Sequence, residues 1–190
     1  MEKKSYILGG MTDAEFHYNS EAGRVDIAGI ACHWDKENLN SQVVDKNSFS
    51  SFMKLYKDGK LTPTLNYEHN MEKRIGLIDS IDLQDDGMWI EAHINARIPY
   101  VSEWLLPLIE AGDLKGLSTE GFPLNGYESI TELENGAIYV KDFILSAVAV
   151  TATPADWDAE FSIANYIENW KQLRAEEEAR KNSLRLGLIM

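Results

Sequence analysis

The chain has 190 residues, of which 44% are hydrophobic and 26% are charged, so it fits one globular domain with at most a short appendage. The same composition excludes collagen-like and wholly disordered proteins. Its 31 acidic and 18 basic side chains give a net charge of -13, and because phosphate backbones and anionic lipids repel such a chain, we expect neither direct nucleic-acid binding nor membrane binding.

The first third of the chain predicts an arm, a strand and a helix. About the first 20 residues are polar with scattered aromatic side chains, and we expect them to form an N-terminal arm. Apolar side chains at alternate positions in 25–31 predict a strand. The apolar residues of 49–56 recur at helical spacing and predict a helix that Ser48 caps and Gly59 ends.

The middle of the chain predicts a hairpin and a second helix. Residues 64–67 are expected to be extended. Residues 75–83 and 88–94 alternate in polarity on either side of an Asp-Asp-Gly sequence, which is typical of a β-hairpin. The apolar pattern of 101–109 predicts an amphipathic helix that ends at Gly112.

The last part of the chain changes from strands to a predicted helix. Residues 114–122 and 143–151 read as strands, with a further hairpin at the Asn-Gly pair 135–136. From residue 157 the apolar residues recur at helical spacing, followed by a charged stretch with i,i+4 ion pairs. We therefore divide the chain into a domain of residues 1–156 and a C-terminal helical arm of residues 157–190, which would dock on the domain or on a partner.

Metal and nucleotide sites are not expected. Among the histidines His17, His33, His69 and His93 and the lone cysteine Cys32, only Cys32 and His33 are close in sequence, and adjacent residues on a strand point to opposite faces. The glycine-rich phosphate-binding motifs and the GxSxG motif are absent. The single cysteine and the lack of a long apolar stretch lead us to expect a soluble cytoplasmic protein.

A serine and a histidine remain as candidates for nucleophilic catalysis. Ser118 lies in a predicted strand flanked by glycines, which would let a substrate backbone approach its hydroxyl. His69 follows another predicted strand, where an imidazole could face a cleft and accept the serine proton. Each residue alone is a weak signal, since serines on strands and histidines at strand ends are usually structural.

The order of the motifs along the chain strengthens the assignment of Ser118 and His69 as a catalytic pair. Between residues 24 and 155 the chain resembles the prohead (capsid maturation) proteases of tailed bacteriophages, the HK97-like group related in fold to the herpesvirus assemblins. The resemblance rests on these features in chain order: Gly29-Ile30-Ala31, Val44-Asp45-Lys46-Asn47-Ser48-Phe49, Tyr67-Glu68-His69-Asn70 before Ile75-Gly76, the Asp86-Gly87 turn, Ala111-Gly112, Gly116-Leu117-Ser118, and Val148-Ala149-Val150-Thr151-Ala152-Thr153-Pro154-Ala155.

The resemblance implies a serine endopeptidase with Ser118 as nucleophile and His69 as general base. Many relatives carry a glutamate that could orient the histidine where this chain has Ala147. The sequence leaves Glu120, on the Ser118 face of its strand, or Asp142, at the head of the last strand, as replacements, or else a bare Ser-His dyad. An orienting acid matters because a histidine in the wrong tautomer is a poor base.

The resemblance also implies the architecture and the biological setting. We expect an α+β, mainly antiparallel β fold, a closed or nearly closed β-barrel with surrounding helices. The substrates would be the scaffold protein or a scaffold-like extension of the capsid protein, the protease itself and, as a further candidate, the portal. Cleavage would take place inside the assembling procapsid in the host cytoplasm, by a homodimer that needs no cofactor and no metal. The alternative is a catalytically inactive structural or scaffolding member of the same fold, which Ala147 would explain.

Overall fold

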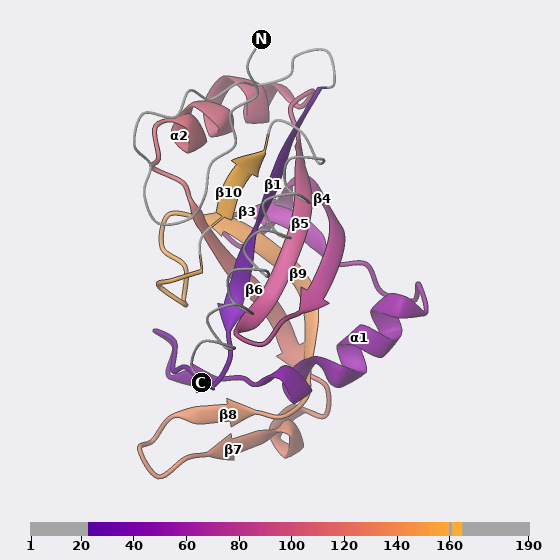
Figure 1. Ribbon diagram of the computed structural model, residues 1–190, viewed down its shortest axis with the longest axis vertical. Helices are drawn as coiled ribbons and strands as arrows, with labels where there is room; N and C mark the ends of the chain where they lie inside the picture. Colours follow the sequence, from indigo (N-terminus) through magenta and orange to yellow (C-terminus); the bar gives the residue numbers. More distant parts are fainter. Residues whose placement is uncertain (1–22, 160, 165–190) are drawn as a thin grey trace, which may run out of the picture.

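Strands dominate the described part of the chain, which comprises residues 23–159 and 161–164 of the computed structural model (Figure 1). The central sheet contains β1 (Arg24–His33), β3 (Thr64–Tyr67), β4 (Asn70–Leu83), β5 (Gly87–Asn95), β6 (Gly116–Pro123), β9 (Phe143–Thr151) and β10 (Phe161–Ala164). A small second sheet contains β2 (Gln42–Val43), β7 (Ile130–Glu132) and β8 (Ile138–Val140). The helices are α1 (Ser50–Lys57), preceded by the 3-10 turn Lys46–Phe49, and α2 (Leu106–Glu110), preceded by the π-helical turn Val101–Leu105; a further 3-10 turn is Gly126–Ser129. Within these residues no helix has the length and apolarity needed to cross a membrane.

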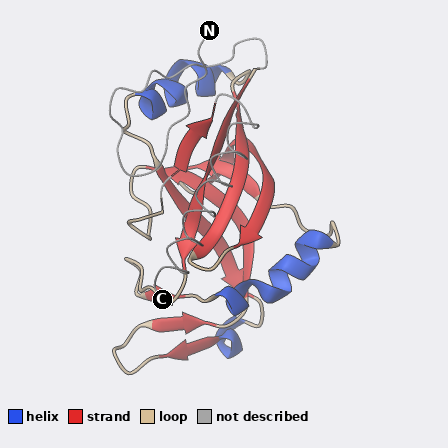
Figure 2. Ribbon diagram, viewed as in Figure 1, coloured by secondary structure: helices blue, strands red, loops and turns tan. Residues whose placement is uncertain are grey.

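The central sheet is mainly antiparallel, as predicted. Its strand order is β10-β1-β5-β4-β3-β9-β6, and only β3 and β9 pair in parallel. The sheet curls like half a barrel, with α2 at one end and α1 and the β7–β8 hairpin at the other (Figure 2). Its inner face packs against the aromatic side chains Phe49 and Phe52, which are almost completely buried. The core therefore lies inside the curl.

The predicted closed or nearly closed barrel is wrong. Closure requires a ladder of hydrogen bonds between the first and last strands, but among the described residues β6 pairs with neither β1 nor β10, although β1 and β6 approach each other. The segment after β9 runs along the free side of β6, where Leu117 N donates to Ala159 O at 2.7 Å. This segment contains Pro154, which has no N–H to contribute to a ladder.

The local predictions in the middle of the chain are confirmed, with one exception at a helix start. The hairpin of β4 and β5, the strands β6 and β9, and α1 followed by Gly59 all lie where the sequence placed them. The cap is different. Asp45 caps the 3-10 turn before α1 by accepting a hydrogen bond from Ser48 N, whereas the Ser48 hydroxyl is buried and donates to Val140 O at 2.6 Å. Ser48 therefore anchors the start of α1 to β8, and in the capping box it is the partner of the cap residue Asp45, whose backbone N–H donates to its hydroxyl.

The predicted C-terminal helix is wrong where the structure describes it. Residues 161–164 form β10, which pairs antiparallel with β1 in the register Asp26 to Ala164. Without β10, β1 would be an edge strand with unpaired backbone groups, and this long-range pairing outweighs the helical spacing of the apolar residues. The rest of the predicted arm, residues 165–190, and the predicted N-terminal arm lie outside the described residues, so the division of the chain at residue 156 stays a prediction.

Candidate active site

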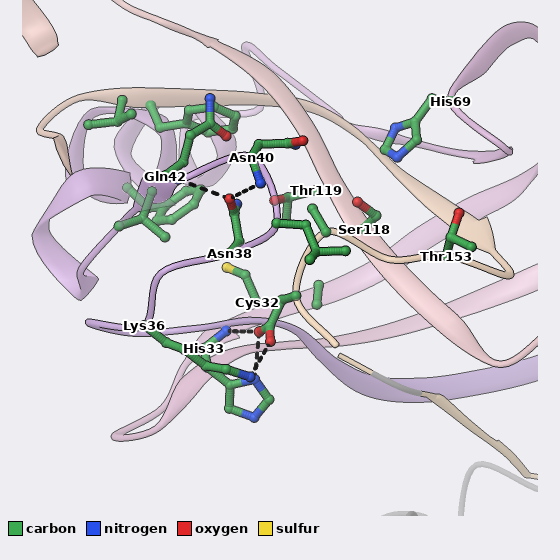
Figure 3. Close-up of a pocket in the computed structure, with 18 residues that line it drawn as sticks. Cys32, His33, Lys36, Asn38, Asn40, Gln42, His69, Ser118, Thr119 and Thr153 are labelled. Atoms are coloured by element: carbon green, nitrogen blue, oxygen red, sulfur yellow. Dashed lines mark hydrogen bonds and ion pairs between the residues drawn. The ribbon is translucent and has the colours of Figure 1, made fainter. Parts of the chain in front are cut away.

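A cavity of about 350 Å³ lies beside the free side of β6. Ser118 and His69 both line it, together with Thr153 from the segment after β9. In the view of Figure 3 these three residues group at one side of the cavity, and Cys32, His33 and Lys36 group at the other. The structure thus brings the two residues singled out in the sequence to one cavity, although no hydrogen bond joins their side chains among the described residues.

Ser118 stands on β6 at the edge of the central sheet. It pairs with Ala149 of β9, and only 3% of the residue is exposed. Its neighbour Leu117 packs into the core, so alternation along the strand turns Ser118 to the opposite face. No side chain or backbone group in the described residues hydrogen-bonds the Ser118 hydroxyl, which leaves it available to a reacting group in the cavity.

His69 stands in the tight turn between β3 and β4. Tyr67 pairs with Asn70, so Glu68 and His69 are the two central residues of a hairpin turn, and their φ angles are +51° and +56°. Both angles lie in the left-handed region, which is the geometry of a type I′ turn and favours asparagine or glycine over glutamate and histidine. The turn carries the imidazole past the end of the sheet, where it is partly exposed at the cavity.

Glu120 is the carboxylate beside His69. Its Oε2 lies 3.3 Å from His69 Nδ1 and 3.1 Å from Asn66 Nδ2, which donates to it. Asn66 is completely buried on β3 and therefore fixes this oxygen in place. Asp142, the other carboxylate considered, precedes the far end of β9, about 25 Å along the strand direction from the residue that pairs with Tyr67.

Small residues on β9 allow this contact. Asn66 comes from β3 and Glu120 from β6, and β9 lies between them, so their backbones are about 10 Å apart. The residues of β9 at this level are Ala147, which pairs with both Thr64 and Glu120, and Ala149, which pairs with Asn66. Alanine side chains leave room above the strand for the amide and the carboxylate to meet. Ala147, where the resemblance implied a glutamate, is thus directly beside Glu120.

The opposite side of the cavity holds a second group of charges. Asp156 accepts hydrogen bonds from His33 Nδ1 at 2.7 Å, from His33 N at 2.8 Å and from Lys36 Nζ at 2.7 Å. Burial alone would raise the pKa of Asp156, but these bonds hold it well below its usual range. The bond to Asp156 raises the pKa of His33, and burial raises the pKa of the Cys32 thiol. This cluster ties β1 to the segment that runs along β6.

The remaining histidines lie outside this arrangement. His93 Nδ1 is 2.8 Å from Asp79 Oδ1, on the β4–β5 hairpin. His17 lies outside the described residues.

Comparison with known proteins decides the family. Residues 13–173 match the profile of the family described as caudovirus prohead serine protease. The chain belongs to this family. No protein with a curated description matches it significantly in sequence. The resemblance seen in the sequence is therefore confirmed, and the prohead protease family is one of serine proteases.

Solved structures share the fold of this prohead protease family member. The bacteriophage T4 capsid assembly protease has a TM-score of 0.51 at 19% identity, over 68% of this chain and 82% of its own. The KSHV protease, solved with a hexapeptide phosphonate inhibitor, has a TM-score of 0.52 at 12% identity, over 75% of this chain and 66% of its own. The assemblin-like fold is thus shared across phage and herpesvirus proteases.

Sequence reasoning missed three residues that shape the site. Asn66 and Glu68 reach their partners only through the pairing of β3 with β9, and Asp156 reaches His33 only through the segment that follows β9. A local signal existed for one of them, because a buried asparagine in the middle of an apolar strand needs a polar partner. No comparable signal marked the other two.

The cluster around Asp156 gives a prediction about stability and pH. Because the pKa of Asp156 is lowered, its carboxylate stabilises the fold above about pH 4, and this stabilisation is lost as the pH falls further. Because the pKa of His33 is raised, its protonated ring stabilises the fold below about pH 6.5, and this stabilisation is lost as the pH rises through the raised value. We expect Asp156→Asn to lower the free energy of unfolding more at about pH 6 than at about pH 9, measured by urea unfolding.

The matched control is Asp158→Asn, which removes the exposed partner of Lys36 and leaves the His33–Asp156 pair intact. A loss of stability in Asp156→Asn that is equal at both pH values would mean that the ion pair with His33 does not contribute.

Proposed function

We propose that this protein is a serine endopeptidase of phage head maturation in which Ser118, His69 and Glu120 act together. The observation that supports this most is the convergence of Ser118 and His69 on one cavity with the Glu120 carboxylate against His69 Nδ1. The membership of the chain in the prohead serine protease family supports the reaction class.

In the proposed mechanism each residue has one task. The Ser118 Oγ attacks the carbonyl carbon of the scissile peptide bond while His69 Nε2 takes the hydroxyl proton, and His69 then gives that proton to the leaving amine. Water, deprotonated by the same nitrogen, then attacks the acyl carbon; the bond from that carbon to Ser118 Oγ breaks, and His69 returns the proton to Oγ. The Glu120 carboxylate accepts a hydrogen bond from Nδ1–H, which keeps Nε2 unprotonated and facing Ser118, and Asn66 holds Glu120 in place.

Glu120 is the better of the two acids considered. It contacts His69, whereas Asp142 lies at the other end of β9. Ala147 suggested an inactive structural member of the fold, but Glu120 places a carboxylate next to that alanine from the neighbouring strand. Because Glu120 contacts His69 without a glutamate at position 147, this contact favours the active enzyme over the inactive alternative.

Membership in the prohead serine protease family supports a proposal for the substrates. We propose that the protein cleaves capsid-associated proteins inside the procapsid: the scaffold or a scaffold-like extension of the capsid protein, the protease itself, and the portal as a further candidate. The T4 relative is a capsid assembly protease, which supports this setting. We propose a homodimer as the assembled form, as the resemblance implies.

The assignment of nucleophile and base is tested with a fluorophosphonate, which labels an activated serine without knowledge of the substrate. We expect wild-type protein to be labelled on Ser118, as mapped by peptide mass spectrometry, and Ser118→Ala and His69→Ala to lose labelling to a similar extent because the two act as a unit. Thermal unfolding of both variants is the control for folding. Labelling that persists in folded Ser118→Ala would falsify the assignment.

The role of Glu120 is tested separately. We expect Glu120→Gln to slow the labelling of Ser118 by about 10²- to 10⁴-fold, because the amide cannot hold His69 in the required tautomer. Asp142→Asn is the matched control and should label at the wild-type rate. If Glu120→Gln also labels at that rate, His69 is oriented by another group or by none.

A further inference from the structure

The turn that carries His69 is strained in a way that its own residues do not relieve. Two neighbouring residues without glycine's freedom, Glu68 and His69, both have left-handed φ angles. Left-handed φ angles are unfavourable for residues that carry a Cβ atom. In a hairpin turn selected only for folding, asparagine or glycine would stand at these positions. Something outside the hairpin must hold the turn.

The Glu68 side chain makes those outside contacts. Its Oε2 accepts a hydrogen bond from Thr151 Oγ1 at 2.9 Å, and its Oε1 accepts one from Ala152 N at 3.0 Å. In addition, Glu68 N donates to Val150 O at 3.1 Å. All three partners belong to the end of β9 or the residue after it. Hydrogen bonds to a charged carboxylate are stronger than those between neutral groups.

The same network reaches the wall of the cavity. The Thr151 hydroxyl, which donates to Glu68, also accepts a hydrogen bond from Thr153 N at 3.1 Å, and Thr153 lines the cavity near Ser118 in Figure 3. Thr151 is almost completely buried and pairs with Gly116, two residues before Ser118 on β6. One carboxylate therefore connects the histidine turn, the end of β9 and the cavity wall.

We propose that Glu68 is a positioning residue that latches the His69 turn to the end of β9 and thereby aims the imidazole at Ser118. The proposal rests on the proposed function, because a strained turn that the fold alone does not need is explained if His69 is the catalytic base. Glycine at position 68 would relieve the left-handed strain and still allow the hairpin, but it would lose both bonds of the carboxylate. The turn would then form without the carboxylate's hydrogen bonds to Thr151 and Ala152.

The test uses Glu68→Gly in the full chain, with Glu72→Gln as control for an exposed carboxylate on the same hairpin. We expect Glu68→Gly to remain folded, as checked by thermal unfolding, because relief of the left-handed strain at position 68 offsets part of the loss of the two carboxylate hydrogen bonds. Its maximal rate of Ser118 labelling by a fluorophosphonate should fall by about 10- to 100-fold, with the half-saturating reagent concentration unchanged, because a small misplacement of the base slows the chemical step. Glu68→Gln, which keeps an acceptor oxygen, should recover part of the rate, and Glu72→Gln should match wild type.

A second readout does not depend on activity. The Ala152 amide donates to Glu68, so its hydrogen exchange, measured by NMR, should be faster in Glu68→Gly and in Thr151→Val than in wild type. Wild-type labelling rates in both folded variants would overturn the proposal. Loss of folded structure in Glu68→Gly would also overturn it, because the carboxylate would then serve the fold. If wild-type protein is itself not labelled, the proposed function fails, and faster Ala152 exchange still shows the latch.

Discussion

Strand β9 pairs with β3 on one side and with β6 on the other, and the position of every candidate catalytic side chain depends on these two pairings. Because side chains alternate along strands, residues that pair across the sheet share a face. Val148 of β9 pairs with Leu65 and Thr119, and the side chains of Leu65 and Val148 lie in the core. The next residue of β9, Ala149, pairs with Asn66 and Ser118, so these three side chains lie on the opposite face. The two alanines of β9 leave the space in which Asn66 meets Glu120. A larger residue there would separate the carboxylate from its amide donor.

In the proposed mechanism, a substrate would bind at the open side of the sheet. Strand β6 has a strand partner only on its β9 side in the described residues, and the cavity lies along its other side. Had β6 joined β1 in a closed barrel, backbone pairing would fill the space beside Ser118. Instead the segment after β9 covers part of this side, held by Asp156 to His33 and by Thr153 to Thr151. The feature that contradicts the predicted closed barrel is thus the one that the proposed chemistry requires.

Local patterns explain which parts were predictable. The β4–β5 hairpin carries its own signals in its alternating polarity and in the turn at Gly87, and β9 carries one in its run of mostly apolar residues; the sequence places both correctly. Strand β10 depends on pairing with β1, a contact more than a hundred residues distant in sequence, and helical spacing gave the wrong answer there. The spacing of Glu120 from Ser118 put both on one face, but only the register of β3 against β9 brings His69 and Asn66 to that carboxylate. Glu68 had no local signal, since its partners lie at the end of β9.

In the proposed mechanism Ser118 and His69 react as one unit, with Glu120 behind the imidazole. A crystal structure of the protein after reaction with a fluorophosphonate tests it most directly. We expect phosphorus bonded to Ser118 Oγ, His69 Nε2 within about 3 Å of an oxygen of the adduct, and Glu120 still against Nδ1. An adduct on another residue, or an imidazole turned away from Ser118 in the adduct, would contradict it.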